Sequence, residues 1–571
     1  MGRAAARPAR SALPISLVRI FRRHLPSLSR LLVACCAVIT CSLGPAAAQE
    51  PPAERKIPSF AELEAAGAVI GEISINNQNI FDMGDEKENN VLYRAANAIH
   101  IRTRAGLIES KLLFKQGERV SVRLIEETER LLRTYRFVYD VSIAPAAYRD
   151  GVVDIEVKTR DTWTLAPTVS FGRAGGVNTH SSSLSEFNAL GTGVFAGASR
   201  TSNADRTGVE YRITDPHAFD GWTVIDAAVD QNSDGGARML SLTRPFYALE
   251  TRWAAGLTAS TDNRIDSVFT NGTITSQFRH RQDKAEAFGG WSEGLVEGWA
   301  HRYSLGVTYE KDSYNLEPGL APPPQLPADQ TLTAPFLRYE VVQDSFDKVK
   351  NRDLIERPEF FAMGWQSSLQ LGRALTGLGS TQDSWLYTGS ASDGFRLPAG
   401  QILLTSASID GQSGYSPLER QLLSGSVRYY SRPQGNTLLF ASVSGDTLRD
   451  ANSSDQLLLG GDTGLRGYPR GYQSGDRRAL FTVEERVYTD WYPFRLFRVG
   501  GAVFYDEGRA WGGPTENAAN AGWLRDVGFG LRILSARAAF GNVLHLDLAF
   551  PLNRDPNIKS VQFLVVTKLT L

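Results

Sequence analysis

Apolar and polar positions follow two different periods along the chain, and the change lies near residue 160. Apolar residues recur at helical spacing over 91–99 and again over 121–134, where Val122, Ile125 and Leu132 share one face. An apolar stretch over 70–75 and alternating segments at 137–144 and 152–158 read as strands. The pattern therefore predicts a small α+β domain over 68–160 with the order βααββ.

From Trp163 onward the helical period disappears, and segments of about ten residues alternate between apolar and polar positions. In the last segment one face carries Phe563, Val565, Thr567, Leu569 and Leu571. The opposite face of that segment includes Lys568. In hydrocarbon every backbone N–H and C=O must be hydrogen-bonded, which a closed barrel of strands achieves. Strands that are apolar on one face and polar on the other fit such a barrel, with lipid outside and a polar lumen. The pattern predicts an all-β transmembrane antiparallel barrel over 163–571.

The number of strands follows from how many alternating segments are accepted. The count lies between about 16 and 20, depending on doubtful segments at 282–292 and 383–393. We expect 16 strands, with 20 as the alternative, and an even number with both ends in the periplasm. The stretches around 321–324 and 449–477 are too long for tight turns, so we expect them in extracellular loops.

The first 48 residues have the features of a signal peptide. They contain seven arginines and no acid, followed by an apolar run over 31–43 and three alanines at 46–48. A spanning helix needs about 20 apolar residues, so we expect cleavage before Gln49 rather than a retained membrane helix. Residues 49–66 are then expected to be a flexible leader or one short helix.

Composition narrows the possible chemistry. All three cysteines lie within the first 48 residues, so the rest of the chain cannot depend on disulfides. Without the seven arginines, the remaining charge is about −8, which does not indicate a nucleic-acid partner. The seven histidines are scattered, and neither metal-ligand spacing nor a nucleophile or phosphate-binding motif is found. We therefore expect no enzyme, metal or cofactor.

Alternation places two carboxylates in the lumen after a long loop. In the segment 479–490 the apolar positions face lipid, so Glu484 faces inward, and the same reasoning points Asp506 inward in the next segment. The loop before them carries Arg466, whose planar guanidinium matches carboxylates, and Gly467, which permits close backbone approach. We predict a latch between Arg466 and these two acids. The alternative is a solvated Arg466 and two acids that line a wet pore.

Three motifs near the C-terminus carry a family resemblance. They are Leu465-Arg466-Gly467-Tyr468, then Phe504-Tyr505-Asp506-Glu507-Gly508, then Gly528-Phe529-Gly530-Leu531-Arg532. In this order they resemble the BamA/TamA superfamily of outer-membrane assembly and secretion barrels, also called the bacterial surface antigen family. The turns at 188–193 and 214–216 look like its early barrel turns, and the domain at 68–160 is similar to its periplasmic POTRA domain. The resemblance implies that the loop folds back into the barrel and that its arginine contacts inward residues.

The resemblance also implies a function and partners. The expected protein is a barrel of a Gram-negative-type cell outer membrane, with its N-terminal domain in the periplasm, that assembles or translocates polypeptides. Outer-membrane lipid, an extended polypeptide client and periplasmic accessory proteins or chaperones would be its partners. The alternatives are a two-partner secretion pore for one dedicated client, a passive porin or structural surface antigen, and a lipid-handling protein.

The first and last barrel segments are the expected site of client insertion. The first segment, 163–172, holds Pro167 and Gly172, both poor for ladder bonding. The last segment supplies the assembly signal, formed by Phe563, Val565, Leu569 and Leu571. Two features depart from the family: a single POTRA-like domain, and Leu571 where such barrels usually end in an aromatic residue.

Overall fold

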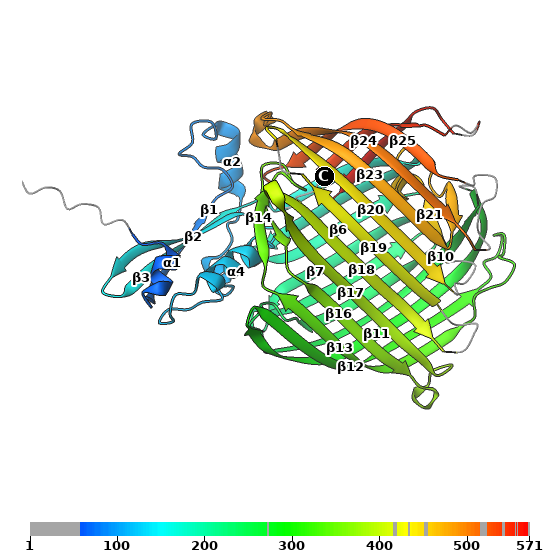
Figure 1. Ribbon diagram of the computed structural model, residues 1–571, viewed down its shortest axis with the longest axis horizontal. Coiled ribbons are helices and arrows are strands. Elements are labelled where there is room, and N and C mark those ends of the chain that lie inside the picture. The colour runs from blue at the N-terminus through cyan, green and yellow to red at the C-terminus, as the bar shows by residue number, and fades with distance from the viewer. Residues whose placement is uncertain are drawn as a thin grey trace, which may run out of the picture. The chain divides into compact units, whose positions relative to one another are not determined.

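The structure is a computed structural model (Figure 1). It describes residues 57–270, 273–414, 420–431, 434–449, 455–513, 522–538, 543–553, 556 and 558–568. The expected signal peptide and the first part of the expected leader lie outside the described residues. A short helix, α1 (Phe60–Ala65), occupies the rest of that leader. It begins with a capping box in which the Ser59 side chain and the Glu62 side chain each accept the other residue's backbone N–H.

A three-stranded sheet forms the small domain before the barrel, in the order β1 (Val69–Gln78), β3 (Val152–Asp161), β2 (Val138–Arg149). Strand β1 runs parallel to β3, and β2 runs antiparallel to it. Helices α2 (Val91–Ile99) and α4 (Val122–Leu132) are the two predicted helices, and the short α3 (Ala105–Glu109) lies between them. Ile125 and Leu132 of α4 are buried against the strands, which gives this domain its own apolar core.

Twenty antiparallel strands close into a barrel after this domain. In chain order they are β4 (Leu165–Ala174), β5 (Val177–Ala189), β6 (Val194–Ser202), β7 (Thr207–Ala218), β8 (Thr223–Asn232), β9 (Gly235–Arg244), β10 (Trp253–Thr270), β11 (Thr273–Val296), β12 (Trp299–Asn315), β13 (Gln330–Gln343), β16 (Gln366–Ala374), β17 (Ser384–Leu397), β18 (Gln401–Ser413), β19 (Arg420–Tyr430), β20 (Thr437–Arg449), β23 (Arg477–Tyr488), β24 (Phe497–Trp511), β25 (Leu524–Ser535), β26 (Val543–Pro551) and β27 (Gln562–Lys568).

The expected number of 16 strands was wrong, and the alternative of 20 is correct. Both doubtful segments are wall strands: 282–292 lies in β11, and 383–393 lies almost wholly in β17. Strand β11 has 24 residues, whereas about 9–11 residues suffice to cross the hydrocarbon. A strand of that length extends beyond the lipid, so charged residues on both of its faces obscure the alternation that identifies shorter strands.

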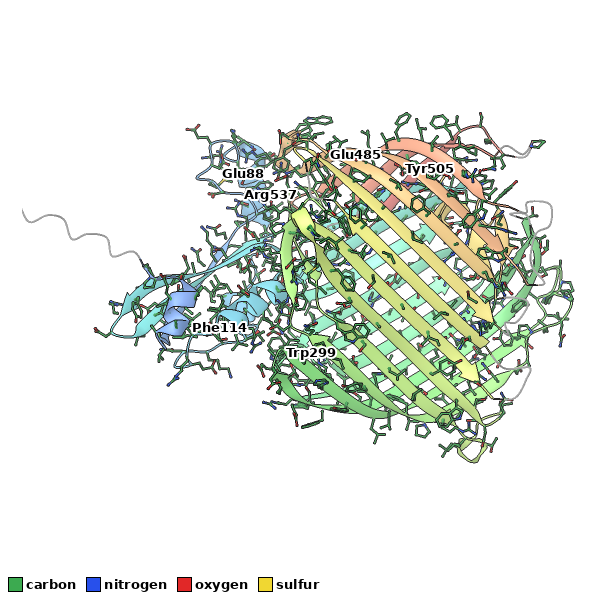
Figure 2. All side chains as sticks on the ribbon, viewed as in Figure 1. Glu88, Phe114, Trp299, Glu485, Tyr505 and Arg537 are labelled. Atoms are coloured by element: carbon green, nitrogen blue, oxygen red, sulfur yellow. The ribbon has the colours of Figure 1, made fainter. Side chains whose placement is uncertain are left out.

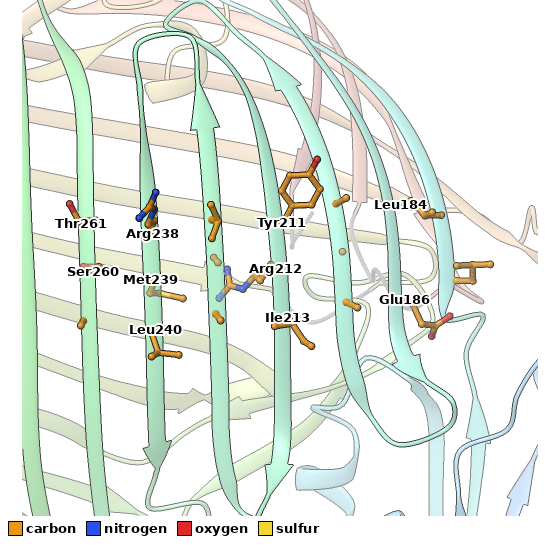
Figure 3. Close-up of a pocket in the computed structure, with 18 residues that line it drawn as sticks. Leu184, Glu186, Tyr211, Arg212, Ile213, Arg238, Met239, Leu240, Ser260 and Thr261 are labelled. Atoms are coloured by element: carbon orange, nitrogen blue, oxygen red, sulfur yellow. The ribbon is translucent and has the colours of Figure 1, made fainter.

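The barrel wall is apolar outside and polar inside, as the alternation predicted. Leu305 is 63% exposed and Val503 is 61% exposed on the outer face. Glu485 and Tyr505 share that outer face with Val503, and Figure 2 labels both on the barrel wall. Among the described residues, no helix is both long and apolar enough to cross a membrane.

Long connections lie at both ends of the barrel. Because β4 starts beside the small domain and neighbouring strands alternate in direction, the connections after β12 and β20 lie at the opposite, distal end. These are the two loops expected from their length. At the proximal end, next to the small domain, a hairpin of β14 (Phe346–Lys350) and β15 (Pro358–Ala362) separates β13 from β16. The sequence pattern did not single out this hairpin.

Candidate functional site in the barrel lumen

The distal connection between β20 and β23 folds back into the lumen. Its described part, 455–476, contains a small ladder of β21 (Leu457–Leu459) and β22 (Gln473–Gly475). Leu459, Leu465 and Tyr468 are each at most 1% exposed. They pack together with wall residues of β24 and β25, so apolar burial stabilises the inward position of the loop.

Arg466 lies at the inner end of this loop and contacts both predicted carboxylates. Its Nε and Nη2 donate to the two oxygens of Asp506 at 2.7 and 2.9 Å, and its Nη1 donates to Glu484 Oε1 at 2.8 Å. Asp547 lies 3.6 Å away, and the guanidinium carbon stacks 3.4 Å from the centre of the Phe504 ring. The structure thus brings Arg466, Glu484 and Asp506 together, and we refer to these three residues as the latch.

Gly467 and Tyr468 hold the loop beside the latch. The Gly467 N–H donates to Asp526 Oδ2 at 3.0 Å, and a Cβ at Gly467 would lie 2.7 Å from the Cβ of Asp526. The Tyr468 hydroxyl donates to the Arg525 carbonyl at 2.8 Å. A larger residue at 467 would therefore push the loop away from β25.

Two further arginines surround the latch. Arg486 Nε donates to Glu484 Oε2 at 3.0 Å, and Arg532 donates to Asp547 and lies 3.7 Å from Glu484. All are buried, and the three guanidinium groups face three carboxylates of Glu484, Asp506 and Asp547. Removal of one partner from such a cluster leaves an uncompensated buried charge.

Burial and charge act in opposite directions on Arg466 in the loop. Burial by itself would lower the pKa of its guanidinium, because it disfavours the charged form. The adjacent carboxylates of Asp506 and Glu484 outweigh burial and raise that pKa above its usual value. Arg466 therefore stays charged, and the latch depends on its positive charge.

Glycines of the wall make room for the latch. A Cβ at Gly528 would lie 2.3 Å from the Phe504 ring, and a Cβ at Gly530 would lie 1.9 Å from Asp547 Oδ1. At Gly508 a Cβ would approach a backbone oxygen of β23 to 2.9 Å. Gly528 and Gly530 thus permit the close packing of Phe504 and Asp547, whereas Gly508 permits the close approach of β23.

The first and last strands meet at a weak seam. Among the residues that the structure describes, strand β27 pairs with β26 at seven positions, but with β4 only where Val565 faces Arg173. Phe563 is 45% exposed on the outer face of β27. Leu569 and Leu571, the other two residues of the expected assembly signal, lie outside the described residues.

Sequence reasoning missed two acids of the site, although their signal was present. Asp526 lies two residues before Gly528, and Asp547 lies opposite Gly530, so the inward face of each strand already carried them. Asp353, which contacts Arg486 from the proximal hairpin, had no such signal because its position depends on tertiary folding. Among the described residues, no group of histidines, cysteines or acids is arranged to hold a metal ion.

Comparison with known proteins adds a likeness of architecture. No family model matches the sequence, and no curated protein matches it. CdiB from Escherichia coli is 12% identical, with 88% of this chain and 76% of that chain covered and a TM-score of 0.45. BamA from Haemophilus ducreyi, lacking POTRA domains 1–3, is 14% identical over 87% of this chain and 84% of that chain, with a TM-score of 0.36.

The fold is also similar to that of a protein of a different kind. The FrpB iron transporter from Neisseria meningitidis is 10% identical over 88% of this chain and 84% of that chain, with a TM-score of 0.36. At these identities and TM-scores the likeness singles out no family. Function therefore has to be inferred from the geometry of this barrel.

Proposed function

We propose that the chain is an outer-membrane barrel that assembles or translocates polypeptides without catalysis of its own. The observation that carries this proposal is the seam. Within the described part of the chain, which ends at residue 568, strands β4 and β27 share one registered pair, whereas every other pair of neighbouring wall strands shares at least seven. Parting the wall at this seam costs far fewer ladder contacts than parting it elsewhere.

An opened seam offers two strand edges. Unpaired N–H and C=O groups on such edges are templates for another strand, and a client segment that pairs with them restores the bonding that lipid cannot supply. Gly172 adds to the weakness, because it offers no side chain to pack across the seam beside Val565. The latch stabilises β23 to β26 on one side of the seam, so the wall keeps its shape while the seam opens.

The small domain supplies an edge for an extended client before it reaches the barrel. Within the described residues β2 pairs with β3 alone, and its outer edge is open. Ser142 and Ala144 on β2 are exposed. An extended peptide could add to this edge by backbone hydrogen bonds, largely independent of its sequence.

A passive porin fits the lumen less well. The distal loop with its latch enters the barrel from one end, and the proximal hairpin enters it from the other. Steady conductance that is unchanged by Arg466→Ala would favour a porin.

Client capture at β2 tests the first step. Ser142→Cys carrying a photo-crosslinker should capture extended polypeptides several-fold more often than Lys158→Cys, its exposed direct partner on the central strand β3. The two positions share their surroundings, but β2 is an edge strand whereas β3 is paired on both sides. Residues 57–571 contain no native cysteine. Equal capture at both positions, or capture of folded proteins alone, would contradict the proposal.

A reversible lock tests the seam. The pair Arg173→Cys and Val565→Cys faces across β4 and β27, at a separation suited to a disulfide. Cells that depend on the locked protein should lose the same outer-membrane proteins as a deletion strain, and a reductant should restore them. The matched pair Ala391→Cys and Ala407→Cys, across β17 and β18, should have no effect. A normal outer-membrane proteome with the seam locked would overturn the insertion step.

A further inference from the structure

The proximal hairpin is longer and more buried than a connection between neighbouring wall strands requires. Antiparallel strands are usually joined by about 2–5 residues, whereas β13 ends at Gln343 and β16 begins at Gln366. Figure 1 shows β14 at the end of the barrel that faces the small domain. Ile355 at the hairpin tip is 1% exposed, and Met363 is 3% exposed.

The tip packs against lumenal residues from several wall strands. Ile355, Phe361 and Met363 form one apolar cluster with the wall. The wall residues of that cluster are Ile402, Tyr430, Leu438, Phe440, Tyr488, Leu534 and Val543. These residues come from β18, β19, β20, β23, β25 and β26, which follow one another along one part of the wall, so the hairpin folds inward over the proximal mouth beside that part.

Polar contacts fix the tip in one position. The Tyr430 hydroxyl donates to both oxygens of Asp353, at 3.0 and 3.1 Å. Arg486 Nη1 donates to the Arg352 carbonyl at 2.7 Å and lies 3.3 Å from Asp353 Oδ1. Glu359 accepts the backbone N–H groups of Arg352 and Asp353 at 3.1 and 2.9 Å. Loss of any one partner would leave a buried polar group uncompensated, so these contacts hold the tip in place.

Arg486 connects this tip to the latch. The same guanidinium that contacts Asp353 donates to Glu484 at 3.0 Å, and Glu484 accepts from Arg466 at 2.8 Å. Segments that enter the lumen from opposite ends of the barrel therefore meet on one pair, Arg486 and Glu484.

The base of the hairpin contacts both the wall and the small domain. Arg396 of β17 donates hydrogen bonds to the Asp347 carboxylate from Nε at 3.0 Å and from Nη2 at 2.9 Å. Lys348 pairs with Glu129 of α4 at 2.6 Å, and the guanidinium carbon of Arg130 lies 3.8 Å from the centre of the Phe346 ring. A movement of α4 would thus act directly on the hairpin.

Serines line the lumen wall on the distal side of the hairpin. Ser368, Ser390, Ser408 and Ser424 occupy directly paired positions on β16 to β19, and they line a cavity of about 480 Å³. Small hydroxyl groups neither occupy much of the passage nor bind a passing solute strongly. This side of the barrel suits the movement of hydrated solutes.

We propose that the β14–β15 hairpin is a plug that closes the proximal end of this serine-lined passage, and that α4 of the small domain controls its release. The plug does not depend on the polypeptide client: a barrel of any transport function would be closed in this way. Its opening would let small ions pass.

Conductance of the full chain in planar bilayers tests the closure. Replacement of residues 347–361 by a short Gly-Ser linker should raise conductance by at least about tenfold, because the hairpin no longer fills the proximal end. As a control, a linker in place of 319–327, in the distal connection after β12, should leave conductance near that of the natural chain. Equal conductance of the natural chain and the hairpin variant would overturn the plug.

Thiol labelling tests the contacts and does not need a deletion. Ile355→Cys should react slowly with a membrane-impermeant maleimide, and several-fold faster when Tyr430→Phe removes the two hydrogen bonds to Asp353. Tyr387→Phe, which removes a hydroxyl on the outer face of β17 where it accepts from Gln421, should not change the rate. Arg130→Ala on α4 should accelerate labelling, whereas Arg94→Ala on α2 should not. If neither Tyr430→Phe nor Arg130→Ala accelerates labelling in barrels with unchanged heat-modifiability, the proposed contacts and their control by α4 are wrong.

Discussion

Arg466→Ala is expected to lower the free energy of unfolding of the barrel by about 3–5 kcal/mol, the usual cost of breaking a buried ion pair from one side. The substitution leaves Asp506 and Glu484 buried, 2% and 5% exposed, without their central partner. It also removes the guanidinium that stacks on Phe504. Urea titration of the folded barrel in lipid vesicles, followed by tryptophan fluorescence, measures the change.

The same loop offers a matched control. Arg470 pairs with Asp205 at 3.0 and 2.9 Å, but both side chains are partly exposed. Arg470→Ala should therefore cost about 1 kcal/mol or less. Arg466→Lys should fall between the two, since an ammonium keeps the charge but cannot make the two-pronged contact with Asp506. Equal losses for Arg466→Ala and Arg470→Ala would show that the latch contributes no special stability.

The latch could be predicted from sequence because it depends mainly on strand alternation. Once Phe481 and Val483 are assigned to the lipid face, the period of two places Glu484 in the lumen. Only the folding of the loop back into the barrel had to be taken from the family resemblance. The contacts of Arg486 were harder to foresee. Its inward direction follows from the same alternation, but its partner Asp353 comes from a segment without a distinctive pattern.

The hairpin itself lay beyond sequence reasoning for a physical reason. Strands β14 and β15 have five residues each, and their apolar residues resemble part of another wall strand. What turns them inward is the cluster around Tyr430, whose members lie far apart in the chain. Burial that is shared among so many strands leaves no local signal. The number of strands was also hard to predict from the sequence. Strands longer than the membrane carry charge on both faces, which obscures their alternation.

The two inward segments also explain why the C-terminal motifs contain so much glycine. The wall there has to accommodate three guanidinium groups, three carboxylates and an aromatic ring within a few ångströms of the backbone. Side chains on every inward position would fill that space. Glycine at alternate positions of β25 keeps the ladder intact while it leaves one face open.

Gly530→Ala is accordingly expected to destabilise the barrel by about 3–5 kcal/mol, comparable with the loss of the latch arginine. The added methyl group would lie 1.9 Å from Asp547 Oδ1 and 2.4 Å from the Leu546 carbonyl. Asp547 cannot move without breaking its contact with Arg532 and its 3.6 Å approach to Arg466. The expected result is a lower midpoint in urea and less folded, heat-modifiable barrel on gels.

Gly425→Ala in the middle of β19 is the matched control. A Cβ there would meet nothing closer than a carbonyl oxygen at 3.8 Å. Without a clash, a glycine-to-alanine change reduces the freedom of the unfolded chain and should stabilise by about 0.4–1 kcal/mol. The two substitutions are chemically identical, so opposite signs would locate the effect in the close packing of Asp547 against β25. If Gly530→Ala stabilised the barrel as Gly425→Ala does, the close packing of Asp547 against β25 would be wrong.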